Sequence, residues 1–155
     1  MQNSDEIKKA KLRAMKLLTG RDYTEAVLRS KLIDDKYSDE AVEAAIEYVR
    51  SYGYIDDLRY AQNYVRCNNT TRSPRDMAMR LRNKGVSQDI IETALKTEGA
   101  DESEETELIK RLIRKKCPDP KQLDHMGRQK LYAYMYGKGF DTGRVSRVLD
   151  DMNDA

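Results

Sequence analysis

The feature that most constrains the fold of this chain is a threefold internal repeat. The segments 30–46, 79–95 and 133–149 align without gaps. In each, an apolar residue ends one helix, a second apolar residue follows five positions later, and a residue suited to cap a helix comes next. In chain order these residues are Leu32, Tyr37 and Ser38; Leu81, Val86 and Ser87; and Met135, Phe140 and Asp141. Such a repeat predicts stacked copies of one helical unit.

Each copy continues past its cap as an amphipathic helix. Apolar residues recur there at the spacing that lines one helix face. They are Val42, Ala45 and Ile46; Ile91, Ala94 and Leu95; and Val145, Val148 and Leu149. Another helix ends at the apolar residue before the turn. Its predicted N-caps lie eight positions upstream, at Thr24, Ser73 and Gly127.

The turn between these two helices has a characteristic residue before its apolar anchor. This residue is Gly85 in the second copy and Gly139 in the third. Glycine suits the left-handed conformation that closes a helix, so both turns are predicted to adopt it. Lys36 occupies this place in the first copy, where the turn is predicted to be strained.

A further helix precedes each pair. It is predicted from about residue 5 to 18 in the first copy, after Asp56 or Asp57 in the second, and after the acidic stretch 101–107 in the third. No sustained alternation of apolar and polar residues predicts a strand. The predicted fold is all-α, with three tandem three-helix repeats in an elongated, curved array. The predicted repeats are residues 1–53, 54–99 and 100–155, the last with an acidic tail.

Side chains suited to catalysis or metal binding are scarce. His125 is the only histidine, and Cys67 and Cys117 are isolated along the chain. No nucleophile with a base, metal cluster or phosphate-binding loop can be assigned. We therefore predict a binding protein that is not an enzyme, takes no cofactor or metal, and is a monomer. No stretch approaches the roughly 18 apolar residues of a membrane span, which favours a cytoplasmic protein without membrane contact.

Charge is distributed unevenly along the chain. Residues 59–97 carry eight basic and three acidic side chains, and residues 108–147 carry eleven and three. The segment 98–107 between them holds six acids and no base. Basic surface of this kind favours an anionic partner, although an ordinary solvated helix surface can look similar.

The basic residues of the second and third copies are the candidate contacts for a partner or for DNA. On the helix predicted over 74–84, Met77 and Leu81 mark the buried stripe, so its arginines and lysine should face solvent. The candidate residues are Arg59, Arg66, Arg72, Arg75, Arg80, Arg82, Lys84, Arg128, Lys130, Lys138, Arg144 and Arg147.

Several tyrosines fall in pairs at helical spacing. The pairs are Tyr48 with Tyr52, Tyr60 with Tyr64, and Tyr132 with Tyr136. Tyrosine commonly packs at seams between helices with its hydroxyl in water, and we favour that interpretation. Stacking against nucleic-acid bases is the alternative.

Three stretches of the sequence resemble the RecX family of bacterial recombination regulators. They are GYIDDLRYAQNYVR at 53–66, RLRNKGV at 80–86 and GKGF at 137–140. The resemblance spans nearly the whole chain, with Lys36 in place of the usual glycine and a Cys117-Pro118 linker as departures. The family signature corresponds to Tyr54, Asp56, Asp57, Arg59 and Tyr60.

The resemblance implies both a fold and a function. RecX-like proteins consist of three tandem three-helix repeats, in agreement with the repeat found above. They bind the RecA–single-stranded-DNA filament in its helical groove and restrain strand exchange, ATP hydrolysis and co-protease activity. The implied processes are homologous recombination, DNA repair and the SOS response. The signature is expected mainly to build the junction between the first and second repeats.

Two other functions stay open from the sequence. The chain could be a helical nucleic-acid-binding module that acts without a protein partner, or an adaptor that binds only proteins. Single-stranded DNA is expected to bind weakly or only through RecA. Binding to bare single-stranded DNA, compared with binding to a preformed RecA filament, separates these functions.

Overall fold

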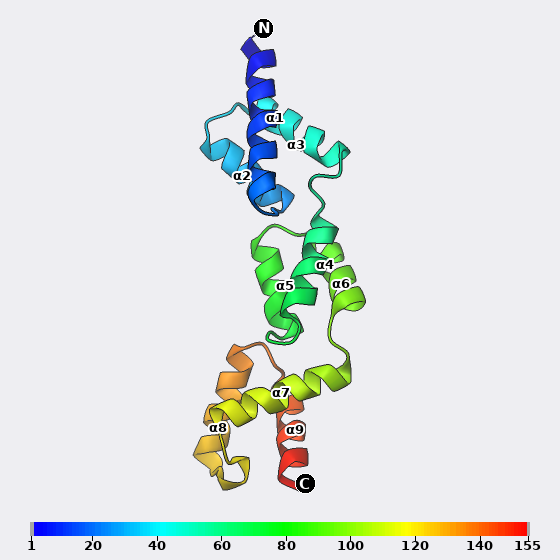
Figure 1. Cartoon of the computed structure of the whole chain (residues 1–155). Helices are drawn as coiled ribbons and strands as arrows, with labels where there is room; N and C mark the ends of the chain where they lie inside the picture. The colour runs from blue at the N-terminus through cyan, green and yellow to red at the C-terminus, as the bar shows by residue number, and fades with distance from the viewer. Residues whose placement is uncertain (1, 155) are drawn as a thin grey trace. The chain divides into compact units, whose positions relative to one another are not determined.

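The structure, a computed structural model, describes residues 2–154 (Figure 1). Within that range it contains nine α-helices, one short 3-10 helix and no strand, so the predicted all-α fold is confirmed. The helices are α1 (Gln2–Gly20), α2 (Glu25–Asp34), α3 (Asp39–Ser51), α4 (Asp57–Asn68), α5 (Pro74–Asn83), α6 (Gln88–Glu98), α7 (Glu102–Lys116), η1 (Pro120–Gln122), α8 (His125–Gly137) and α9 (Thr142–Asp154). In Figure 1 the first three helices run from blue to cyan, the next three are green, and α7 to α9 run from yellow to red.

The chain forms two compact units. One consists of residues up to 63 together with 80–94, and the other of residues 64–79 together with 95 onwards. The second repeat, α4 to α6, contributes to both units. The predicted elongated and curved shape of the whole array stays a prediction.

In the first unit the core forms where α3 packs against α1 and α2. Ala10 and Ala14 of α1 lie in this core together with Ala41 and Ala45 of α3. All four are buried, and such small side chains allow two helix axes to approach closely. Larger apolar residues fill the space beside this contact, namely Leu28, Leu32, Val42, Ile46, Val49 and Ile55.

In the second unit α9 packs against α7 and α8. Phe140, the only phenylalanine of the chain, is buried in this core just before α9 begins. Its neighbours in the core are Leu108, Ile109, Ile113, Leu131, Met135, Val145, Val148 and Leu149. Val145, Val148 and Leu149, which were predicted to line one face of the last helix, are therefore buried as expected.

Most predicted helix caps are confirmed. Ser38 Oγ accepts a hydrogen bond from Ala41 N at 3.2 Å, and Asp141 Oδ2 accepts one from Arg144 N at 3.2 Å. Ser87 Oγ accepts an equivalent bond at 3.4 Å, and Asp101 Oδ1, in the acidic stretch but not itself predicted as a cap, accepts one at 2.8 Å. A polar oxygen at this position satisfies one of the backbone donors that a helix start leaves unpaired.

The cap predicted at Gly127 is wrong. Helix α8 begins three residues earlier than that alignment implies, and Asp124 is its N-cap. Gly127 instead donates its backbone N–H to Asp124 Oδ1 at 2.7 Å. Glycine has no side-chain acceptor, so the carboxylate nearby takes the capping position. Helix α1 is also longer than predicted, since it begins at Gln2 and includes Gly20.

The predicted left-handed turns are confirmed. Gly85 has a φ of 84° and Gly139 a φ of 97°. Lys36 has a φ of 72°, an uncommon conformation for a residue with a side chain. The strain predicted at this turn therefore has a structural basis.

Candidate functional site

The first structural element of the site is the contact between the first and second repeats. Thr24 is buried at the start of α2. Its hydroxyl accepts a hydrogen bond from Val27 N at 3.2 Å and donates one to Lys84 O at 2.6 Å. One hydroxyl thus caps α2 and binds the turn that ends α5. We call this contact the first joint.

The second repeat contacts the third in the same way. Ser73 is buried at the start of α5, and its hydroxyl accepts from Asp76 N at 3.0 Å. It donates to Lys138 O, at the turn that ends α8, at 2.8 Å. We call this contact the second joint. Thr24 and Ser73 are the only buried polar residues among those that the structure describes. Their burial is compatible with stability because each hydroxyl is used both as donor and as acceptor.

The glycines of the two turns are needed for space as well as for conformation. A Cβ atom on Gly85 would overlap the Cβ of Ala26, on the first turn of α2. A Cβ atom on Gly139 would overlap Ser73 Oγ, the atom that makes the second joint. Both turns therefore approach the preceding repeat so closely that only glycine fits.

These joints account for two departures from the pattern that the repeats share. Lys36 occupies the glycine position of the first repeat, and within residues 2–154 no earlier repeat packs against its turn. Lys36 is accordingly exposed. Gly127 occupies the hydroxyl position of the third repeat, and no later repeat within that range requires a donor. The departures fall where the described chain forms no joint.

The family signature lies beside the first joint. Asp56 Oδ1 accepts from Arg59 N at 3.1 Å and so caps α4, while Arg59 Nη1 donates to Gly53 O at 3.0 Å. Asp57 makes a different contact, because its Oδ1 accepts from Glu25 N, at the first residue of α2, at 2.9 Å. The bond of Asp57 joins the start of α4 to the start of α2, while the bonds of Asp56 and Arg59 order the segment between α3 and α4 locally.

Asp57 is half-buried, and this burial raises the pKa of its carboxyl group, partly offset by the hydrogen bond from Glu25 N. The corresponding helix start at the second joint is Pro74, which has no N–H to satisfy. A second carboxylate is therefore unnecessary there.

Several of the candidate basic residues are paired with acidic groups of the same chain. Arg66 contacts Glu98 at 3.1 Å and Arg72 contacts Asp76 at 3.0 Å. Further pairs are Arg128 with Asp150 at 3.6 Å and Arg144 with Glu105 at 3.9 Å. Arg144 also donates to Glu102 O at 2.9 Å. These contacts tie together parts of the second unit, so the charges are partly neutralised before any partner arrives.

The basic residues of α5 are arranged largely as predicted. Met77 and Leu81 are buried, and the side chains of Arg75, Arg80 and Arg82 are exposed. Lys84 differs, because it is half-buried in the turn of the first joint. The prediction that it is exposed with the others is therefore wrong.

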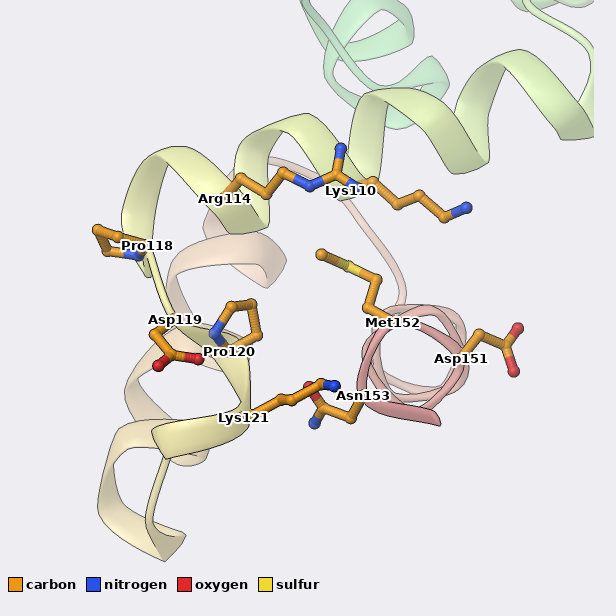
Figure 2. Close-up of a pocket in the computed structure, with 9 residues that line it drawn as sticks. All are labelled: Lys110, Arg114, Pro118, Asp119, Pro120, Lys121, Asp151, Met152 and Asn153. Carbon is orange, nitrogen blue, oxygen red and sulfur yellow. The ribbon is translucent and has the colours of Figure 1, made fainter. Parts of the chain in front are cut away.

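In the third repeat, Lys130, Lys138 and Arg147 are exposed. A hollow that the sequence did not single out lies between α7, η1 and α9. Figure 2 shows Lys110 and Arg114 of α7 along its rim and Lys121 across from them, with Asp151 pointing away. The spacing of four between Lys110 and Arg114 places them on one helix face and could have indicated this site.

The tyrosines divide into two groups. Tyr60, Tyr64 and Tyr132 are half-buried, as expected for packing at helix seams. Tyr52, Tyr54 and Tyr136 expose 62%, 45% and 55% of their surface. Tyr54 belongs to none of the pairs found by helical spacing, because it follows the end of α3.

Groups suited to chemistry are not gathered in the part of the chain that the structure describes. No three His, Cys, Asp or Glu side chains there are placed to hold a metal ion. Nor is any helix in this part long and apolar enough to span a membrane. His125 and Cys67 are exposed and Cys117 is half-buried.

The fold and its joints define a class: tandem three-helix-repeat proteins that join successive repeats through a buried hydroxyl and a glycine turn. Models of the first, second and third three-helix domains of RecX match residues 10–48, 56–95 and 102–149. The chain therefore belongs to the RecX family.

Relatives from several organisms match along most of the chain. A regulatory protein RecX from Prosthecochloris aestuarii is 30% identical over 154 residues, covering 98% of this chain and 98% of its own. Another, from Caldanaerobacter subterraneus subsp. tengcongensis, is 32% identical over 149 residues, covering 96% of this chain and 73% of its own. These relatives are named as regulatory proteins.

Solved structures support the same fold. The crystal structure of RecX from Lactobacillus salivarius superposes with a TM-score of 0.86 at 21% identity, covering 98% of this chain and 99% of its own. A second crystal structure, of a regulatory protein RecX, gives a TM-score of 0.85 at 28% identity, covering 96% of this chain and 74% of its own. The exact repeat boundaries at 53/54 and 99/100 stay predictions.

Proposed function

We propose that this chain binds the RecA–single-stranded-DNA filament and restrains its recombinase, ATPase and co-protease activities. The observation that carries the proposal is the match of all three RecX domains along the chain, with relatives that are named regulatory proteins. In this proposal the chain acts by binding and catalyses no reaction.

The exposed cations of α5 support an electrostatic contact. Arg75, Arg80 and Arg82 face away from the buried stripe of Met77 and Leu81. A surface of this sign attracts phosphate groups and acidic protein surface, and its attraction weakens with salt. Weak contacts made by several repeats of one chain then add through their high effective concentration.

A charge-reversal experiment tests this contact. The variant carries Arg80→Glu and Arg82→Glu, and leaves Lys84 unchanged because its turn belongs to the first joint. Exposed charges contribute little to stability, so the helical circular dichroism signal should persist. Affinity for a preformed RecA filament should fall at least about tenfold, with a shallower dependence on salt.

The matched control is Arg21→Glu with Lys31→Glu. Both residues are exposed, both lie over the ring of Tyr23 at 5.1 Å and 5.5 Å, and the change in net charge is the same. The control should bind the filament within about twofold of the parent, because it leaves the α5 cations intact. If the α5 variant also binds like the parent, α5 is a solvated surface and not the contact.

Comparing targets separates the proposal from its alternatives. The parent should bind the filament more tightly than bare single-stranded DNA at physiological salt. Equal binding to both would favour a general nucleic-acid-binding module. Binding to RecA without DNA as tightly as to the filament would favour an adaptor that recognises only protein.

A further inference from the structure

Three tyrosines form one aromatic surface in the first unit. The rings of Tyr48 and Tyr52 lie 5.0 Å apart between centroids, and those of Tyr52 and Tyr54 lie 5.7 Å apart with an interplanar angle of 15°. Tyr48 lies in the last turn of α3, Tyr52 is the C-cap residue that follows it, and Tyr54 follows the left-handed turn at Gly53. We call these three residues the tyrosine platform.

Packing accounts for only part of the platform. Tyr48 is half-buried against the core of the first unit. Tyr52 and Tyr54 instead expose 62% and 45% of their surface, although their rings stack on each other. A stacked pair of rings held open to water leaves a flat apolar face available to a planar ligand.

Two cations lie close to this surface. Lys11 Nζ of α1 lies 4.8 Å from the centroid of the Tyr48 ring. A shallow groove runs alongside, lined by Met15 and Leu18 of α1, Tyr54 and Arg59. Arg59 is exposed and held in place by its bond to Gly53 O.

The charge of helix α1, which brings Lys11 to the platform, favours an anionic ligand. Helix α1 carries five basic residues against two acidic ones, and Lys8, Lys9 and Lys16 are exposed. Of the acidic groups closest along the chain, Glu47 forms an ion pair with Arg50 at 2.7 Å, whereas Asp56 and Asp57 accept hydrogen bonds from backbone N–H groups. Single-stranded nucleic acid combines planar bases with negative phosphates and matches both properties of this surface.

We propose that the tyrosine platform binds unpaired bases of single-stranded DNA. Bases stack on Tyr52 and Tyr54, and the phosphates that join them face Lys11 and Arg59. The platform lies at the end of α3 and in the segment just after it, whereas the cations in the proposed filament contact lie on α5. This proposal needs no RecA, so it stands or fails separately from the proposed function.

Direct binding of DNA to the full chain tests the platform. The ligand is a labelled oligothymidylate of about ten nucleotides, within the usual range of one single-strand site. A strand of equal length in which the bases are replaced by abasic sites keeps the phosphate charge. The parent should bind the base-containing strand at least about tenfold more tightly than the abasic one, because stacking needs the base.

Paired substitutions identify the residues. Tyr52→Ala with Tyr54→Ala should lower affinity for oligothymidylate at least about tenfold and remove the preference over the abasic strand. Tyr52→Phe with Tyr54→Phe keeps the rings and should bind within about twofold of the parent. Tyr136→Ala is the matched control, an exposed tyrosine of the second unit that lies under Arg75. It should leave the preference for bases unchanged.

Two results would overturn the proposal. One is an alanine pair that is folded by circular dichroism and still binds oligothymidylate like the parent. The other is a parent that binds the abasic strand as tightly as the base-containing one. If the alanine pair keeps its DNA affinity and loses only RecA filament binding, the platform contacts protein instead. If the alanine pair loses its preference for bases but still binds the RecA filament, the result supports the tyrosine platform without testing the α5 contact.

Discussion

Replacing Gly85 with alanine should weaken the first joint between repeats. Gly85 ends the turn after α5 with a φ of 84°. The new Cβ atom would overlap the Cβ of Ala26, which lies on the neighbouring helix α2. The same turn carries Lys84 O, the acceptor for the buried hydroxyl of Thr24. A shift that relieves the overlap would therefore lengthen that hydrogen bond.

Two effects contribute to the cost, and the chain provides a way to separate them. A side chain at positive φ destabilises the fold by about 1–2 kcal/mol. Alanine also restricts the unfolded chain more than glycine does, which offsets a smaller part of this cost. Forcing an extra carbon into a packed contact costs about a further 1–3 kcal/mol. Gly53 has a φ of 71°, but a Cβ atom there would meet nothing within 4 Å. Gly53→Ala should therefore show the first effect alone.

Urea unfolding followed by circular dichroism measures both variants. We expect Gly85→Ala to lower the free energy of unfolding by about 1–3 kcal/mol more than Gly53→Ala does. Comparison of the slopes with urea checks that the amount of structure lost on unfolding is the same.

A second change tests the assigned contact directly. Ala26→Gly removes the Cβ atom that the new side chain would meet, at a cost of about 1 kcal/mol in a helix. In that background Gly85→Ala should cost no more than Gly53→Ala does. Equal costs for Gly85→Ala and Gly53→Ala in the parent, or no coupling with Ala26→Gly, would refute the joint as the reason for glycine.

Two further changes probe the same unit. Lys36→Gly should raise the free energy of unfolding by up to about 1 kcal/mol, because it relieves a φ of 72° at an exposed turn; an unchanged urea midpoint would mean that this turn is not strained. Burial raises the pKa of Asp57, so its carboxyl group holds a proton more tightly in the folded chain than in the unfolded chain. The free energy of unfolding should therefore fall as the pH rises through the raised pKa. Asp57→Asn keeps an acceptor for Glu25 N and should remove this part of the pH dependence, as measured by urea midpoints between about pH 4 and 7; an identical profile would contradict the assignment.

Local features of the structure could be predicted from the sequence because their partners are close along the chain. Ser38 and Asp141 cap helices by binding an N–H three residues later. Gly85 and Gly139 close turns that the repeat pattern already placed. The repeat alignment gave the wrong cap at Gly127. Glycine has no side-chain acceptor, and Asp124 caps the helix instead. The family resemblance rested on such local motifs and is confirmed by the domain matches.

Contacts between distant residues were decided only by the tertiary structure. Helical periodicity shows which way a side chain faces, but not which residue it meets 60 positions away. The sequence therefore placed Thr24 as a cap without its second bond to Lys84 O. It likewise grouped Arg66 with the candidate contact residues without its ion pair to Glu98. Only packing of α1 beside α3 brings Lys11 to the tyrosine platform, because burial of their shared alanine faces fixes how the two helices meet.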